Sequence, residues 1–155
     1  MSENQLQVQQ AYEAYTREIL QMMVNYIDGN PEVDRVWLYT DLNNDTIQTY
    51  PFFRFRGQFL DHNDIAEADD SHEYDVWALM DELAAAPTQV ELLRACRGLG
   101  ERPDRIITVY DPQEGELSSE WHYTEDVLVG PDDNYGRALD RWITSMGGEP
   151  VFGGN

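Results

Sequence analysis

Residues 105–123 read RIITVYDPQEGELSSEWHY, and this stretch predicts a β-hairpin. The half from Arg105 to Tyr110 is rich in β-branched and aromatic side chains, which favour an extended strand. The segment 111–115 then has the composition of a turn, with proline in its second position and glycine at its end. The chain returns over 116–123 as the antiparallel partner strand. This hairpin favours an antiparallel sheet as the centre of the fold.

A three-stranded meander is predicted upstream of the hairpin. Phe53 and Phe55 alternate there with Arg54 and Arg56, and this period of two indicates a sheet with one solvent-exposed face. Arg56 and the glycine after it can turn the chain into the next strand. The predicted strands lie at 35–40, 46–55 and 58–64, with a polar turn at 41–45 between the first two.

Helices are predicted before, between and after these strands. Apolar residues spaced three and four apart from Val8 to Ile27 form one stripe of a first helix. In the middle segment, Tyr74, Trp77 and Leu83 share the same helical spacing. The predicted helices run over 8–27, over 74–96 with a break at Pro87, and over 131–146.

The order of these elements predicts the fold class. Hairpins dominate over crossover connections, so we expect an α+β fold: an antiparallel sheet of about five strands with helices packed on one face, and with N- and C-terminal helices. The chain has no internal repeat and no convincing domain boundary, which favours a single domain over 1–155. Within it we expect 5–147 to be folded and 148–155 to be a flexible tail.

The chain is strongly acidic. Thirty acidic residues stand against ten basic ones, all of them arginine, and the formal net charge is -20. Such self-repulsion destabilises a compact domain, so we expect another pressure to maintain it; a cationic partner, solubility and a high-salt environment are the candidates. Nucleic-acid backbones and anionic membranes should repel this surface, so direct binding to either is not expected.

The expected location is the cytoplasm. The single Cys96 excludes an internal disulfide and fits a reducing compartment, and its place on an apolar helical stripe predicts a buried thiol. The first ten residues have neither the basic region nor the apolar run of a signal peptide. No stretch is long and apolar enough to span a bilayer.

The sequence offers no catalytic or cofactor-binding motif. It has no nucleophile elbow and no glycine-rich phosphate loop, and it contains no lysine for such a loop. His62, Asp64 and His72 match no zinc spacing, and the segment 41–45 lacks the later ligands of a calcium loop. We therefore expect a non-enzymatic protein without metal or cofactor. The alternative is an uncharacterised hydrolase, which a metal in the purified protein would indicate.

Two acidic tracts are candidates for binding a partner. The first, residues 61–75, contains seven acidic residues and no basic one. The second begins in the turn of the hairpin, runs over 111–133 and carries Trp121 and Tyr123 among its carboxylates. Aromatic anchors within a complementary charge field are typical of interfaces. The alternative for each tract is a solvated face that aids only solubility. The predicted partner-binding residues are Asp61, Asp64, Glu67, Asp69, Asp70, Glu114, Glu116, Glu120, Trp121, Tyr123, Glu125 and Asp126.

Several segments between residues 15 and 146 share a pattern of elements and aromatic residues with a known family. They are RVWLY at 35–39, FFRF at 52–55, QFL at 58–60, IITVYDP at 106–112, GEL at 115–117 and WHY at 121–123. In these segments the chain resembles the YezG-like immunity proteins, which are small cytoplasmic antitoxins encoded beside bacterial polymorphic toxins. The resemblance implies an α+β fold and neutralisation of a cognate toxin, often a nuclease, by direct contact.

The leading hypothesis is an acidic binding protein that neutralises a basic toxin domain. A DNA mimic, or another acidic regulator of a nucleic-acid-binding protein, is the alternative, in which carboxylates take the place of phosphates. A third possibility is an ordinary domain adapted to high salt, because abundant carboxylates with arginine as the only base fit that environment as well.

Overall fold

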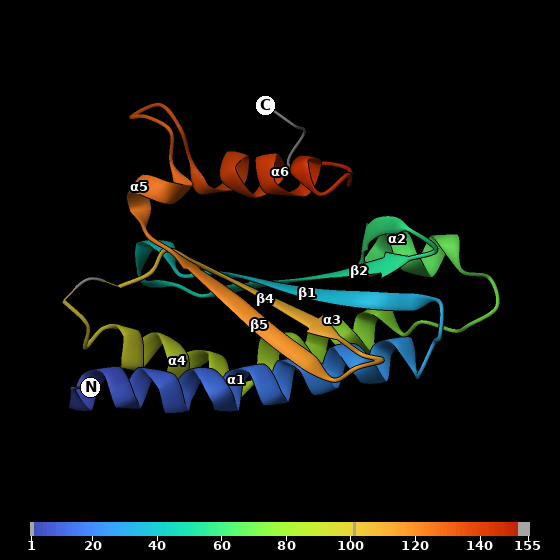
Figure 1. Cartoon of the computed structure of the whole chain (residues 1–155), viewed down its shortest axis with the longest axis horizontal. Helices are drawn as coiled ribbons and strands as arrows, with labels where there is room; N and C mark the ends of the chain where they lie inside the picture. Colours follow the sequence, from blue (N-terminus) through green and yellow to red (C-terminus); the bar gives the residue numbers. More distant parts are fainter. Residues whose placement is uncertain (1, 101, 152–155) are drawn as a thin grey trace.

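The computed structural model describes residues 2–100 and 102–151, which form an antiparallel sheet between helices (Figure 1). The predicted α+β class, the five antiparallel strands and the helices near both ends are confirmed. The elements are α1 (Glu3–Ile27), β1 (Val33–Asp41), the 3-10 helix η1 (Asn43–Asp45), β2 (Gln48–Phe55), β3 (Gln58–Asp61), α2 (His62–Ala68), α3 (Val76–Ala85), α4 (Pro87–Cys96), β4 (Arg105–Asp111), β5 (Glu116–His122), α5 (Thr124–Val127) and α6 (Tyr135–Ser145).

The strands pair in the order β3-β2-β1-β4-β5, so the predicted meander and hairpin are joined through β1 and β4. β3 ends at Asp61 instead of continuing to residue 64. The Asp61 side chain accepts hydrogen bonds from the backbone N–H groups of Asn63 and Asp64, and this cap begins α2. The first acidic tract, residues 61–75, therefore contains a helix.

One face of the sheet is covered by α1, α3 and α4 (Figure 1). The stripe predicted for the first helix lies against this face, and Tyr15, Ile19 and Met23 of α1 are fully buried. Cys96 at the end of α4 is buried here as predicted, and burial raises the pKa of its thiol to about 11.

The opposite face is covered as well, so the prediction that helices pack on one face only is wrong. α6 lies across this face (Figure 1). The neighbours Phe52 and Phe53 point to opposite faces of β2, and they are 2 % and 0 % exposed. The alternation of phenylalanine and arginine over 53–56 predicts one solvent-exposed face of the sheet. Phe52, on the same face of β2 as Arg54, makes that face apolar where α6 covers it. The cluster beneath α6 contains Trp37, Tyr39, Phe52, Phe59, Ile107, Leu139 and Ile143.

The boundaries of the last helix also differ from the prediction. α6 begins at Tyr135 instead of residue 131, because the Asn134 side chain accepts a hydrogen bond from the Arg137 backbone N–H and caps the helix there. The short α5 occupies a segment for which the sequence predicts no helix.

The predicted tail over 148–155 is packed at its start, and its residues from 152 on lie outside the described residues. Gly148 lies so close to Phe59 that a Cβ atom would come within 2.6 Å of the Phe59 Cδ1 atom. Val151 donates its backbone N–H to the buried Asp140 carboxylate at 2.7 Å. The folded part of the chain therefore extends beyond residue 147.

The buried hydroxyl of Tyr15 links α1 to the sheet and is expected to contribute to stability. It lies 2.8 Å from Thr40 Oγ1 and 2.9 Å from Thr49 Oγ1. Replacing Tyr15 by phenylalanine removes both hydrogen bonds and leaves the Thr40 hydroxyl buried, so we expect the free energy of unfolding to fall by about 1–2 kcal/mol. Chemical denaturation measures this change.

Tyr50→Phe is the matched control. Tyr50 is half-buried, and its hydroxyl makes no hydrogen bond to a described residue. Its replacement should change the free energy of unfolding by less than about 0.5 kcal/mol. Equal losses in the two variants would contradict a structural role for the Tyr15 hydroxyl.

Candidate functional site

Acidic residues and arginines are unevenly distributed along the chain. Residues 57–93 contain ten acidic side chains and no arginine. Seven arginines outside this segment form ion pairs with carboxylates, at N–O distances from 2.6 to 3.1 Å. Only Arg94 pairs with a carboxylate of the segment, that of Glu91; the other six pairs lie outside it. The segment forms α2, α3 and most of α4, so the remaining negative charge is concentrated on these helices.

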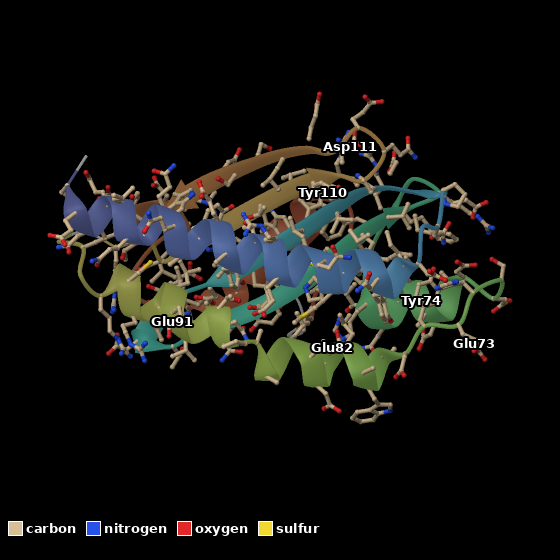
Figure 2. The ribbon with its side chains drawn as sticks, turned by 90° about the horizontal axis from the view of Figure 1, so that it is seen from below. Glu73, Tyr74, Glu82, Glu91, Tyr110 and Asp111 are labelled. Atoms are coloured by element: carbon tan, nitrogen blue, oxygen red, sulfur yellow. The ribbon has the colours of Figure 1, made fainter. Side chains whose placement is uncertain are left out.

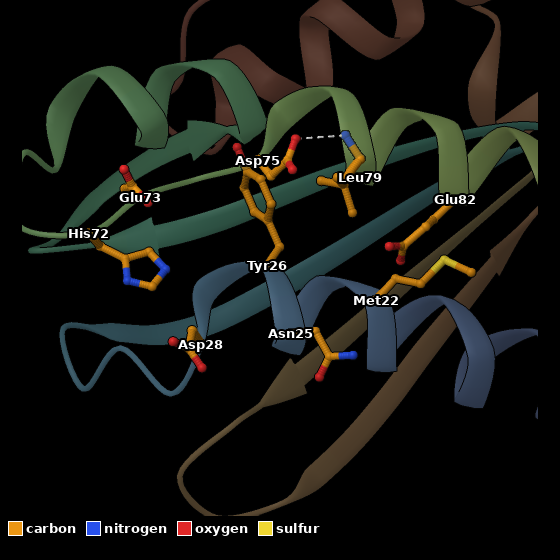
Figure 3. Close-up of a pocket in the computed structure, with 10 residues that line it drawn as sticks. Met22, Asn25, Tyr26, Asp28, His72, Glu73, Asp75, Leu79 and Glu82 are labelled. Carbon is orange, nitrogen blue, oxygen red and sulfur yellow. Dashed lines mark hydrogen bonds between the residues drawn. The ribbon is translucent and has the colours of Figure 1, made fainter.

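A hollow of 230 Å³ lies between the C-terminal end of α1 and α3 (Figure 3). Met22, the buried Tyr26 and Leu79 contribute its apolar lining. Four exposed carboxylates surround it, and none of them forms an ion pair with an arginine in the part of the chain that the structure describes. An arginine or lysine side chain fits this combination, since its stem packs on apolar groups and its charge meets carboxylates. The four carboxylates belong to Asp28, Glu73, Asp75 and Glu82.

Asp69 fixes the loop that carries Glu73. Its carboxylate accepts hydrogen bonds from Ser71 Oγ at 2.6 Å, Tyr74 Oη at 2.7 Å and Asn30 Nδ2 at 2.9 Å. The hydrogen bonds from Ser71 and Tyr74, that from Ser71 first, lower the pKa of Asp69, whereas burial raises the pKa of Tyr74 to about 12. The loop is thereby attached to Asn30, in the turn between α1 and β1.

Trp77 is 82 % exposed on α3. The helical spacing that it shares with Tyr74 and Leu83 is present in the structure, yet Trp77 does not share the burial of Leu83. α3 turns Leu79 and Leu83 toward the core, which directs Trp77 to solvent. Asp81, one helical turn further along, is exposed as well. An exposed tryptophan among carboxylates has the composition of an interface anchor.

We call Trp77, Asp81 and the four carboxylates around the hollow the α3 surface. Figure 2 shows Glu73 and Glu82 of this surface on the same side of the molecule as Glu91 of α4. Glu73 and Asp75 lie in the first acidic tract but are not among its predicted partner-binding residues, and Asp28, Trp77, Asp81 and Glu82 were missed as candidates. For the residues on α3, the signal that could have found them is the absence of arginine from 57–93, which extends the first acidic tract through α3.

The residues predicted in the first tract have different environments. Glu67 and Asp70 are exposed, whereas Asp61 caps α2 and Asp64 is half-buried, with its pKa raised by burial. Asp69 is only 2 % exposed, and its carboxylate is occupied by three hydrogen bonds. The Asp69 side chain therefore stabilises the loop before α3 and presents no exposed carboxylate at this surface.

The residues predicted in the second tract do not form one surface. Side chains alternate along β5, so Glu116 and Glu120 point away from the face on which Trp121 lies. Trp121 packs against Tyr12 of α1 with 5.1 Å between ring centroids. The prediction expects aromatic residues and carboxylates on one surface. Instead, Trp121 lies on one face of the sheet, and Glu116 and Glu120 lie on the other. Tyr123 shares a groove with Trp121, while Glu114, Glu125 and Asp126 are exposed in the turn before β5 and on α5.

Two further searches of the described residues gave no match. No group of three or more histidine, cysteine, aspartate or glutamate side chains in residues 2–100 and 102–151 is arranged to hold a metal ion. Within the same residues, no helix has both the length and the apolar character needed to cross a membrane.

No protein-family model matches the chain, and no curated protein matches it. The geometry and charge of the α3 surface are therefore the basis for assigning a function.

Proposed function

We propose that this protein is an acidic, non-enzymatic inhibitor that neutralises a basic toxin domain, such as a nuclease, by direct contact. The observation that carries the proposal is the exposure of Trp77 within a segment of ten acidic residues and no arginine. Because Trp77 stays in water, its apolar surface contributes little free energy to folding. A partner that covers Trp77 recovers this contribution at the interface.

The charge of the α3 surface supports a cationic partner. Four carboxylates surround a hollow large enough for a side chain, and all four are exposed. Together with the net charge of -20, they create a field that attracts a basic protein and repels nucleic acid. A basic toxin domain that binds nucleic acid has the complementary charge. The resemblance to the YezG-like immunity proteins supports the same partner class.

The test uses the product of the open reading frame adjacent to the gene. Expressed alone in a bacterial host, this product should arrest growth, and co-expression of the present chain should restore it. The triple variant Asp28→Asn, Glu73→Gln, Glu82→Gln should restore growth poorly, because it removes the attraction around the hollow. A neighbouring product that is harmless, or that this chain does not bind, would count against the proposal.

Binding measurements at several salt concentrations give the physical readout. Affinity should fall at least about tenfold between about 50 mM and about 300 mM salt, since salt screens exposed charges. The triple variant should show a weaker dependence. Glu3→Gln, Asp132→Asn, Glu149→Gln is the matched control, because it removes the same charge from exposed positions outside the segment 57–93. A complex insensitive to salt would contradict electrostatic attraction.

Competition with DNA distinguishes this inhibitor from a DNA mimic. A mimic should compete with DNA for several unrelated DNA-binding proteins, whereas an inhibitor of one toxin should bind only its partner. Trp77 supports the specific inhibitor, because an apolar anchor of this size has no counterpart in a phosphate backbone.

A further inference from the structure

β5 forms one edge of the sheet. It is the last strand in the order, so its outer side pairs with no strand among the residues that the structure describes. Its seven residues pair with β4 in a continuous register and contain no proline, so neither a bulge nor a proline interrupts this edge. The other edge strand, β3, has only four residues and leads directly into α2. β5 is therefore the edge that is better suited to accept an added strand.

An apolar groove of 550 Å³ runs between β5 and α1. Leu117 at its mouth is 50 % exposed, and the Trp121 ring lies against Tyr12 within it. The polar side chains of Gln5, Gln9 and Glu13 on α1 also line it. The groove is a place for apolar side chains of a strand that pairs with β5, because alternate residues of such a strand point to this side. Its apolar lining comes from Val8, Tyr12, Leu99, Leu117, Trp121 and Tyr123.

The other side of the same edge is acidic. Glu116 and Glu120 point to the sheet face opposite the groove, and the Glu120 side chain is 72 % exposed. Basic side chains on the alternate positions of an added strand would lie beside these carboxylates, and such cross-strand pairs of opposite charge are stabilising. One edge thus presents an apolar side and an acidic side, at the spacing of alternating residues in a strand.

We propose that β5 is a docking edge for an extended segment of a basic protein, whose side chains alternate between apolar and basic. The apolar side chains occupy the groove beside α1, and the basic ones meet Glu116 and Glu120. The expected charge of the partner rests on the proposed function. A second copy of the chain fits poorly: antiparallel pairing of two β5 strands centred on Ser118 places Glu116 opposite Glu120 twice, and like charges repel there.

The probe is a synthetic peptide that alternates arginine and valine over about seven residues, the length of an ordinary strand. Its binding should slow hydrogen exchange at alternate amides of β5 at least about tenfold, because these amides gain hydrogen-bond partners. A peptide of the same composition with its arginines and valines in separate blocks tests whether charge alone explains binding. The alternating peptide should bind at least about tenfold more tightly than the block peptide.

Charge reversal at the edge gives the decisive comparison. In the variant Glu116→Lys, Glu120→Lys, preference should switch from the arginine–valine peptide to a glutamate–valine peptide. The variant Glu91→Lys, Asp132→Lys changes the net charge equally on α4 and in the loop before α6, and it should keep the original preference. Equal binding of the alternating and block peptides, protection outside β5, or protection that rises with protein concentration without peptide would overturn the inference.

This experiment is independent of the toxin. If the adjacent gene product proves harmless while the alternating peptide still binds β5, the proposed function fails and the docking edge stands. If the toxin is neutralised through the α3 surface but the peptide preferences are absent, the docking edge fails and the proposed function stands.

Discussion

Replacing Trp77 by alanine is expected to weaken binding of the basic partner at least about thirtyfold, the effect of losing a central aromatic anchor of about 2 kcal/mol. The side chain is 82 % exposed in the free protein, so the free energy of unfolding should change by less than about 0.5 kcal/mol. This combination of a large loss of affinity with unchanged stability distinguishes an interface residue from a core residue. Titration calorimetry and chemical denaturation of the same variant measure the two quantities.

Val129→Ala is the matched control for this result. Val129 is 80 % exposed and lies in the loop between α5 and α6, away from α3 in the sequence. Removing its apolar surface should leave affinity unchanged, which shows that exposure alone does not make an anchor. If Trp77→Ala binds as tightly as the unaltered protein, α3 does not carry the interface.

Replacing Phe52 by alanine should lower the free energy of unfolding by about 3–5 kcal/mol, a large share of the stability of a typical domain. Phe52 is 2 % exposed, stacks on Phe59 with 5.0 Å between centroids, and meets Trp142 of α6 at 5.4 Å. The substitution leaves a cavity between α6 and the sheet. Denaturant titration, with an unchanged dependence on denaturant concentration, gives the measurement.

The comparison with Phe53→Ala tests whether both faces of the sheet are covered. Phe53 is 0 % exposed on the face beneath α1, and its replacement should cost a similar amount. If the face that carries Phe52 were exposed to solvent, Phe52→Ala would lower the free energy of unfolding only slightly, whereas Phe53→Ala would lower it strongly. Two losses of similar size are the expected outcome, and a loss of less than about 1 kcal/mol for Phe52→Ala would contradict the packing of α6.

The candidate site shows how far sequence patterns reach. The first acidic tract ends at residue 75 in the sequence analysis, yet the charge continues through Asp81 and Glu82. Composition identifies the acidic region without distinguishing exposed carboxylates from Asp69, which is buried and hydrogen-bonded. That distinction depends on Asn30 and Tyr74, because a carboxylate can be buried only where such partners lie within reach.

The sequence by itself determined the elements that depend on local chemistry. The strand at Arg105–Tyr110, the turn that ends at Gly115 and the helix from Val8 to Ile27 follow from side-chain type, turn composition and periodicity, and all appear in the structure. The antiparallel pairing follows from the short hairpin connections. Net charge is likewise a property of composition.

Only the tertiary structure decided what covers each face of these elements. Periodicity groups residues on one side of a helix or strand, but it does not say which side meets another element. α3 presents Leu79 to the core, so Trp77 is left in water, and α6 covers Phe52 although arginine follows two residues later. The separation of Glu120 from Trp121 arises in the same way, because α1 packs on only one side of β5.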